Sequence, residues 1–540
     1  MIGLRWHSVD RLRVACIGFS LAAIFGFAAW QRFSIQRVPI PDPDTWGYLC
    51  PALTWLSGEG MVQTAARGMA YPVFMLLALC SGRSFDSIVT MQQLAGLAAG
   101  MAWWWVWVES ARMLPGGWIR RWMVPAVGLA GLFGFLCDGQ RVVDELRLRP
   151  EAVFPLVVLL GIGRGVCFIR ERWIRRNATW AAMWAGIWMM FTLACYSMKP
   201  SWELAVLVAP AVVGLGCLGV GIPLATRFLP VMAVILGTVL AWFVPPAVFQ
   251  WQRERGANAF LPMLLFGVHA DIIHRDMMRR VAAGTLGAEE ALFEEHLGMR
   301  IEESRRLTEY YRRLGFNPDY LMFHSDTLER IPGGEVAGGR REFYLRTYVR
   351  SLFAQPFDYV RKWLTQLSMA YSREPKMVFR ESVAYAPAYR SAVGTLPVTV
   401  ECLPDRLRGA YEDLLSGRGQ PAEPERLTPV PRGSGILGRI GAALLLPLSV
   451  GILASGLVCS WRVIPGTGGP DWRWYCWTMA MVVIAAFLSN LTVAVVHSFD
   501  IERYLHLVAP LNWLVLCGGT VIVAAVVTGF FARRTGELPV

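Results

Sequence analysis

The sequence predicts an α-helical polytopic membrane protein with about ten transmembrane helices, outer-face interfacial helices and one mostly helical soluble insert. Three observations predict this class. Of the 540 residues, 55% are hydrophobic and only 17% are charged, whereas an ordinary soluble domain carries about 25% charged residues. Ten apolar segments approach the length of a membrane span, which is about 20 residues. The short turns rich in arginine fall on alternate connections between these segments, as expected for a multi-pass protein.

The predicted spans share an apolar composition and few charged side chains. They are 14–30, 87–108, 122–136, 152–169, 180–196, 202–218, 228–249, 436–459, 474–496 and 505–530. The first segment follows a basic flank but ends at Trp30 without a small-residue cleavage site. We therefore expect a retained first helix and not a removed signal peptide.

The basic turns fix the predicted orientation. Arginines gather at 112–121, at 170–176, at Arg227, at Arg462 and at 533–534, and all of these turns fall on the side of the N-terminus. The positive-inside rule places that side in the cytoplasm, so both termini are predicted to be cytoplasmic. The net charge of +12 is accounted for by these turns and by the insert. The charge therefore gives no reason to expect nucleic acid as a partner.

The first outer loop, residues 32–86, contains the candidate catalytic groups. Asp42 and Asp44 alternate with prolines just after the first span, and Arg67 follows further along the loop. Residues 71–79 are apolar but too short to cross a bilayer, so we expect an interfacial or re-entrant helix on the outer face. Taken alone, the two aspartates also fit a solvated turn. A loop of this length with helices of its own is more often functional.

Three further outer elements carry polar side chains at span ends. Residues 138–151 hold seven charged groups, among them Asp144, Glu145 and Glu151, and fit either a wet loop or a functional one. Lys199 lies between two spans and fits a snorkelling lysine or a ligand for an anion. The last outer turn contains His497, Arg503 and Tyr504, which fit an interface anchor or a site.

The large insert divides the chain into three regions, namely a transmembrane module at 1–249, the insert at 250–435 and C-terminal spans at 436–540. Helical periodicity predicts helices at 288–314 and 342–369, and proline and glycine predict loops at 375–404 and 420–438. His269 and His274 are five residues apart, which misses the spacing of a helical metal pair. We expect them to be surface residues, and we expect no structural metal site.

Four separated motifs, in this order, resemble those of a known family. They are Asp44-Thr45-Trp46-Gly47-Tyr48 with Ser57-Gly58, the run 67–72 that begins with Arg67 and ends with Pro72, Arg149-Pro150-Glu151, and Glu502-Arg503-Tyr504 with Pro510. Together they resemble the GT-C superfamily of membrane glycosyltransferases, in particular bacterial relatives of protein O-mannosyltransferases and of the lipid A aminoarabinose transferase. Many relatives have Asp-Glu where this chain has Asp44-Thr45, and Asp42 precedes that position.

The resemblance implies a function and assigns roles to residues. It implies an inverting transfer of a sugar from a polyprenyl-phosphate donor to a hydroxyl group of a lipid, glycan or protein acceptor, at the periplasmic face of a bacterial inner membrane. Asp44 is then the expected base and Asp42 the second candidate. The phosphate-binding cations are expected to be Arg67, Lys199 and Arg503, and the substrate-orienting groups Tyr48, Asp144, Glu145, Glu151, His497 and Tyr504. No cofactor is required by this chemistry, and participation of a divalent metal stays open.

Two other classes fit a membrane protein with a basic outer face. A transporter or flippase for a lipid-linked saccharide would bury ionisable residues near the bilayer midplane. Here Glu109 and Arg164 lie near predicted span ends, which favours an enzyme acting at one face. A non-catalytic envelope-assembly protein would use the insert for binding and would tolerate Asp44→Asn.

Overall fold

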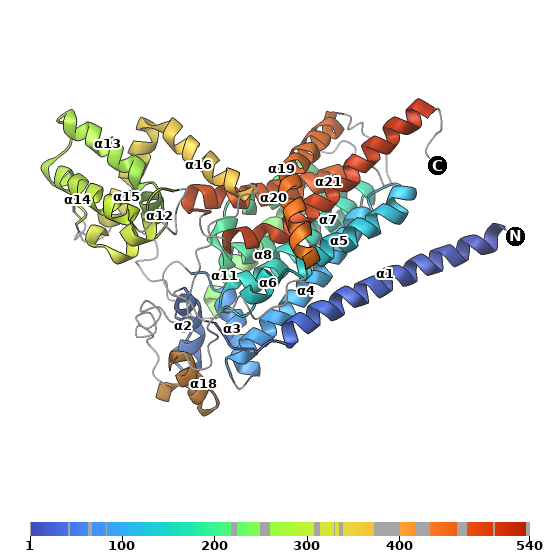
Figure 1. Ribbon diagram of the computed structural model, residues 1–540, viewed down its shortest axis with the longest axis horizontal. Helices are drawn as coiled ribbons and strands as arrows, with labels where there is room; N and C mark the ends of the chain where they lie inside the picture. Colours follow the sequence, from blue (N-terminus) through green and yellow to red (C-terminus); the bar gives the residue numbers. More distant parts are fainter. Residues whose placement is uncertain are drawn as a thin grey trace.

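The computed structural model is a bundle of long helices with a separate group of shorter helices beside one end (Figure 1). It describes residues 2–40, 44–62, 67–82, 84–217, 224–248, 260–306, 314–328, 330–333, 339–371, 400–416, 432–461, 472–499 and 503–535. Within these ranges the regular structure is helical, apart from one isolated parallel bridge between Ile40 and Arg147. The predicted α-helical class is confirmed.

The N-terminal region contributes most of the bundle. Its α-helices are α1 (Ile2–Phe33), α2 (Thr45–Leu56), α3 (Ala70–Ser81), α4 (Asp86–Ala111), α5 (Val124–Leu136), α6 (Gly139–Asp144), α7 (Phe154–Ile169), α8 (Ala178–Met198), α9 (Val208–Cys217), α10 (Leu224–Arg227) and α11 (Leu229–Val248). Short π or 3-10 turns lie at Ile119–Met123, Pro150–Ala152, Arg170–Ile174, Pro200–Trp202 and Ala205–Leu207.

The C-terminal region completes the bundle with α19 (Arg432–Trp461), α20 (Trp472–Val496) and α21 (Arg503–Thr535). The loop predicted up to residue 438 is wrong at its end, because α19 already begins at Arg432. Figure 1 shows the start of α1 and the end of α21 at the same end of the bundle, whereas α2, α3 and the insert helices lie at the other end.

All ten predicted spans contain helix. Within the described residues, however, only six helices are long and apolar enough to cross a membrane, or seven if α3 and α4 form one bent span. Of the four other predicted spans, α4 counts only together with α3, α7 has 16 residues, α9 has ten residues, and α11 counts only as a shorter apolar helix over Leu229–Ala241. The multi-pass class stands, and ten crossings stay a prediction. α3 and α4 meet at 117°, so they do not form one straight helix.

Aromatic side chains fill the centre of the bundle. Trp103 stacks on Trp107 and on Phe135, with ring centroids 6.0 and 6.4 Å apart. Both indole groups donate to carbonyl oxygens on other helices, Trp103 to Pro510 in α21 and Trp107 to Val124 in α5. Since a buried indole N–H needs an acceptor, these bonds hold α4 to two neighbouring helices without an unsatisfied donor.

The insert is helical, as predicted, but its helices have different bounds. They are α12 (Phe260–Val268), α13 (Ala270–Ala282), α14 (Ala288–Arg305), α15 (Gly339–Ala354), α16 (Pro356–Ala370) and α18 (Asp405–Ser416). The single helix predicted at 342–369 is wrong, because Gln355 interrupts it and Pro356 starts a new helix at the position where proline is tolerated. α18 lies in a stretch for which we predicted no helix.

The prediction that His269 is a surface residue is also wrong. Its side chain is buried, its ring stacks on Tyr359 at 4.8 Å, and Nε2 accepts a hydrogen bond from the Trp363 indole. Burial lowers the pKa of His269 to about 3, so this ring is neutral and belongs to the core of the insert. His274 lies nearer the surface, 2.8 Å from Glu294.

Candidate active site

Asp44 and Arg67, from two ends of the first outer loop, meet in an ion pair. Arg67 Nη2 lies 2.6 Å from Asp44 Oδ1, and both side chains keep about a fifth of their surface exposed, 21% and 24%. Asp44 is the N-cap residue of α2, but its carboxylate does not cap the helix. The Arg67 guanidinium also lies over the Tyr48 ring, 5.0 Å from its centroid. Three residues predicted for the site are therefore in direct contact.

The start of α2 is fastened to the second outer element. Ile40 N donates to the Leu146 carbonyl at 2.8 Å, and Leu148 N donates to the Ile40 carbonyl at 3.1 Å. The Thr45 hydroxyl donates to the Leu148 carbonyl at 3.3 Å. Two backbone bonds and one side-chain bond thus fix the chain on both sides of Asp44.

Lys199 and Glu151 form a second ion pair, which is almost completely buried. Lys199 Nζ lies 2.6 Å from Glu151 Oε1, and the two side chains are 6% and 3% exposed. The ammonium group also lies 5.9 Å from the centroid of the Tyr504 ring, which in turn contacts the His497 ring at 4.7 Å. Four predicted site residues from three outer elements therefore form one cluster.

The two ion pairs are joined through the chain that leads into α3. Gly68 packs against the backbone of Ser197, so closely that a Cβ atom would collide with the Ser197 carbonyl. Ala70 N donates to the Ser197 hydroxyl at 3.2 Å. Because Arg67 precedes this contact and Lys199 follows it by two residues, the contact places both cations in one region. Only glycine permits the approach at Gly68.

Tyr71 provides a second connection between the pairs. Its ring meets the Tyr48 ring edge-on at 5.4 Å, and its hydroxyl is close enough to Glu151 for the carboxylate charge to act on it. The Tyr71 hydroxyl donates to Gln92, whose amide donates to the Glu145 and Arg147 carbonyls at 2.8 and 2.9 Å. The first loop and the second outer element are thus one hydrogen-bonded unit.

Glu145 does not join this cluster. Its carboxylate receives two hydrogen bonds from the Arg32 guanidinium, at 2.7 and 2.8 Å, and both side chains are essentially fully buried. Gly96 leaves the space that the carboxylate occupies. Burial raises the pKa of Glu145, and the Arg32 charge opposes this shift. We therefore assign Glu145 to the packing of α1, α4 and α6 and not to contact with substrate.

Asp144 has a different partner, one that the sequence reading missed. His506 Nδ1 lies 2.7 Å from Asp144 Oδ2, and Arg147 lies 3.5 Å from the other carboxylate oxygen. Asp138, the N-cap of α6, is near enough to be affected by both His506 and Asp144, and burial raises its pKa. His506 was missed because it is the second residue of the predicted span 505–530, which we assigned to the membrane.

The remaining site predictions fall outside the described part of the chain. Asp42 lies in the stretch 41–43, outside the described residues. Arg503 begins α21, but only its backbone belongs to the described structure. Among the described residues, no three His, Cys, Asp or Glu side chains are grouped so that they could hold a metal ion.

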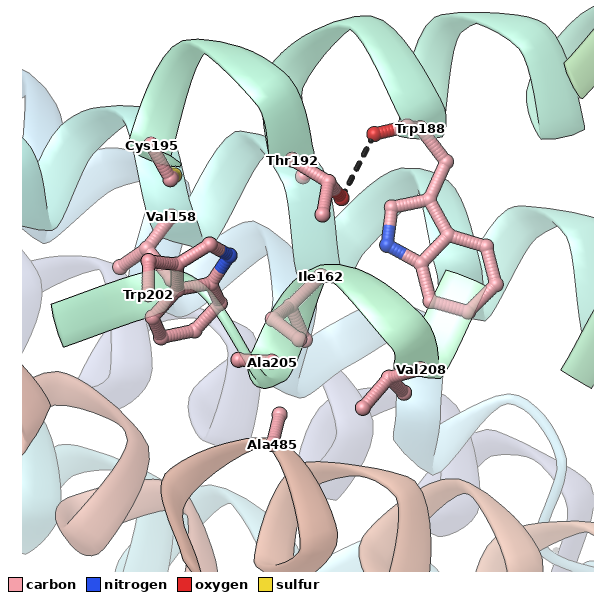
Figure 2. A pocket seen from close by; sticks show the side chains of 10 residues that line it. Val158, Ile162, Trp188, Thr192, Cys195, Trp202, Ala205, Val208 and Ala485 are labelled. Carbon is pink, nitrogen blue, oxygen red and sulfur yellow. Dashed lines mark hydrogen bonds between the residues drawn. The ribbon is translucent and has the colours of Figure 1, made fainter. Parts of the chain in front are cut away.

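A small apolar cavity lies between helices of the bundle. Its volume of about 10 Å³ has room for about one water molecule, and it is lined by residues of α7, α8, α9, α20 and the turns before α9, including Val158, Cys195 and Trp202. Figure 2 shows these side chains around the space, with the Thr192 hydroxyl turned back onto the Trp188 carbonyl at 2.9 Å. Cys195 is one helical turn before Lys199, whose N–H donates to the Cys195 carbonyl. The backbone of Lys199 is therefore one helical turn from a residue that lines the cavity.

Comparisons with known proteins give little support beyond the residues themselves. No family model matches the sequence, and no curated protein matches it. Among solved structures, the chain is similar to the crystal structure of ArnT from Cupriavidus metallidurans bound to undecaprenyl phosphate, at 12% identity and a TM-score of 0.28. The alignment covers 89% of this chain and 78% of that one. At this TM-score the two helix arrangements overlap poorly, so the functional case rests on the site.

Proposed function

We propose that this protein is an inverting membrane glycosyltransferase that transfers a sugar from a polyprenyl-phosphate donor to a hydroxyl acceptor at the outer face of a bacterial inner membrane. The observation that carries the proposal is the pairing of Asp44 with Arg67 in the same region as a second cation, Lys199. This combination offers a base and two charges for a phosphate. The resemblance of the outer-loop motifs to those of GT-C enzymes supports the same function.

The reaction assigns one step to each group. Asp44 takes the proton from the acceptor hydroxyl as its oxygen forms a bond to the anomeric carbon. The bond between that carbon and the phosphate oxygen breaks on the opposite face, and the electron pair leaves with the polyprenyl phosphate. Arg67 and Lys199 stabilise the charge on this leaving group, since both donate charge-assisted hydrogen bonds.

Both cations are paired with carboxylates in the structure. An incoming phosphate therefore competes with Asp44 for Arg67, and binding the donor releases the carboxylate as a base. The Asp44–Arg67 pair is partly exposed, so its net stabilisation is small, about 0 to 1 kcal/mol, and exchange of partners is inexpensive.

The distribution of charge disfavours transport. Glu109 pairs with Arg170 and Arg112, and Glu171 pairs with Arg170 and Arg175. These residues lie at the ends of α4 and α7, on the side where the basic turns are predicted, and they neutralise one another. A carrier is expected to have ionisable groups along a path through the middle of the membrane.

The test is turnover of a polyprenyl-phosphate sugar by Asp44→Asn. We expect the rate to fall by a factor of about 10² to 10⁴, the usual contribution of a general base, with thermal stability nearly unchanged. The matched control is Asp358→Asn in α16, which removes a carboxylate from another partly exposed pair, 3.6 Å from Arg275. Full turnover by Asp44→Asn would refute the assignment of the base, and flipping without sugar transfer by the intact protein would favour the transporter.

A further inference from the structure

The insert helix α16 has a continuous apolar stripe on its exposed face. Phe357, Val360 and Leu364 are 87%, 44% and 59% exposed, and Phe353 at the end of α15 is 80% exposed. The spacing of three and four residues places Phe357, Val360 and Leu364 along one side of α16, and Phe353 comes just before them at the end of α15. Large apolar side chains that gather on one exposed face mark a surface that contacts an apolar partner.

The opposite face of α16 is fixed to the insert. The Tyr359 ring stacks on the buried His269 ring at 4.8 Å, and the Trp363 indole donates to His269 Nε2 at 3.1 Å. Lys362 Nζ lies 2.8 Å from an Asp271 carboxylate oxygen. Rotation of the helix to bury the stripe would break all three contacts, so the stripe faces outward in the folded protein.

The C-terminal end of α16 is attached to a membrane span. The Gln366 side-chain oxygen accepts hydrogen bonds from Phe499 N at 2.7 Å and from the Ser498 hydroxyl at 3.2 Å. These two residues come directly after α20, which ends at Val496. Figure 1 shows α16 running from the other insert helices toward the end of α20. A spanning helix ends near the bilayer surface, so the C-terminal end of α16 lies at about that depth.

Basic side chains accompany the stripe. Arg361 is exposed next to Val360, and Arg350 is exposed one turn before Phe353. An apolar stripe bordered by arginines is typical of helices that lie in the membrane interface, where the stems of the arginines reach the lipid headgroups.

We propose that the stripe formed by Phe353, Phe357, Val360 and Leu364 is embedded in the outer leaflet of the bilayer and anchors the insert there. The attachment to α20 selects the bilayer over a second copy of the chain, since α16 both carries the stripe and contacts the residues that follow a span. The anchor goes beyond the glycosyltransferase reaction and does not depend on it. It fixes the height of the insert above the membrane.

The test uses the full-length protein in nanodiscs of phosphatidylethanolamine and phosphatidylglycerol. Phe357→Cys is labelled with a membrane-impermeant maleimide and read out at that site by mass spectrometry, so that the native cysteines do not interfere. The matched control is Leu292→Cys in α14, where an apolar side chain of the insert is 69% exposed. We expect labelling at 357 to be slower by about tenfold or more, because burying one phenylalanine side chain favours the covered state by at least that factor.

A second measurement identifies what covers the stripe. Lipids with a photoreactive carbene precursor in the upper acyl chain should cross-link to residues 353–364 of the otherwise unmodified protein and not to α14. Equal labelling of the two cysteines would overturn the proposal, because the stripe would then face water. Slow labelling without lipid cross-links would overturn it as well, since a second copy or another segment of the chain would then cover the stripe.

Discussion

Two carboxylate–guanidinium pairs involve residues of the first outer loop and differ in almost every physical respect. Arg32 and Glu145 are buried to within 1% of their surface and share two parallel hydrogen bonds. Asp44 and Arg67 are bound through one short contact at 2.6 Å and are about a fifth exposed. The sequence offers both carboxylates as site candidates in outer loops. The structure separates them by burial.

The difference in burial indicates what each pair can do. A buried pair has already lost its hydration, so either partner left alone is strongly destabilised and exchange with a ligand is costly. In a partly exposed pair, water screens the attraction between the charges, so the pair contributes little to the free energy of unfolding. The partly exposed Asp44–Arg67 pair opens for a substrate at lower cost, and we therefore propose the base at Asp44 and a structural role for Glu145.

The largest effect is expected for Glu145→Ala, which leaves the Arg32 guanidinium buried without its carboxylate. The free energy of unfolding should fall by about 3 to 5 kcal/mol, the usual cost of breaking a buried pair. Thermal unfolding in detergent measures it, with Arg32→Met combined with Glu145→Leu as the control that removes both charges. If Glu145→Ala kept its unfolding temperature but lost turnover, the Arg32–Glu145 pair would serve catalysis and not the fold, which contradicts our assignment.

The next largest effect is expected when the charges of the Asp44–Arg67 pair are reversed by Asp44→Arg together with Arg67→Asp. The ion pair can form again, so the unfolding temperature should change little. Exposed ion pairs contribute only about 0 to 1 kcal/mol to the free energy of unfolding. Turnover should nevertheless be lost, because the base and the cation have changed places. Restored turnover in this variant would mean that the pair acts only as a tether.

Lys199 and Glu151 test an intermediate case, a buried pair beside the proposed phosphate site. Lys199→Met combined with Glu151→Gln removes both charges and should raise the KM for the donor by about 10- to 100-fold, the value of one charged hydrogen bond. Glu151→Gln alone keeps the ammonium group and should not raise the KM for the donor. Steady-state kinetics with varied donor separates the two results, and an equal KM in both variants would exclude Lys199 from donor binding.

The prediction of which residues reach the outer face rests on membrane spans and basic turns, which are local signals. Asp44, Arg67 and Lys199 lie in loops whose side follows from the alternation of those turns. Their partners were not predictable, since Arg32 and Glu145 are 113 residues apart and nothing in either segment indicates the other. The buried His269 was misjudged for the same reason, because its aromatic partner Tyr359 comes from a distant helix.

The smallest effect is expected for Thr45→Val, which tests whether Asp44 depends on the second outer element for its position. The variant preserves the shape of a fully buried side chain but removes the hydrogen bond to the Leu148 carbonyl. The loss should be about 1 kcal/mol of unfolding free energy, the usual contribution of one such bond. Because the two backbone bonds of Ile40 still hold the loop, turnover should fall only by a small factor at unchanged KM. A loss of turnover as large as that of Asp44→Asn would instead mean that the Thr45 hydrogen bond alone positions the base. The two ion pairs would then differ in function because of the hydrogen bonds that hold them in place and not because of their burial.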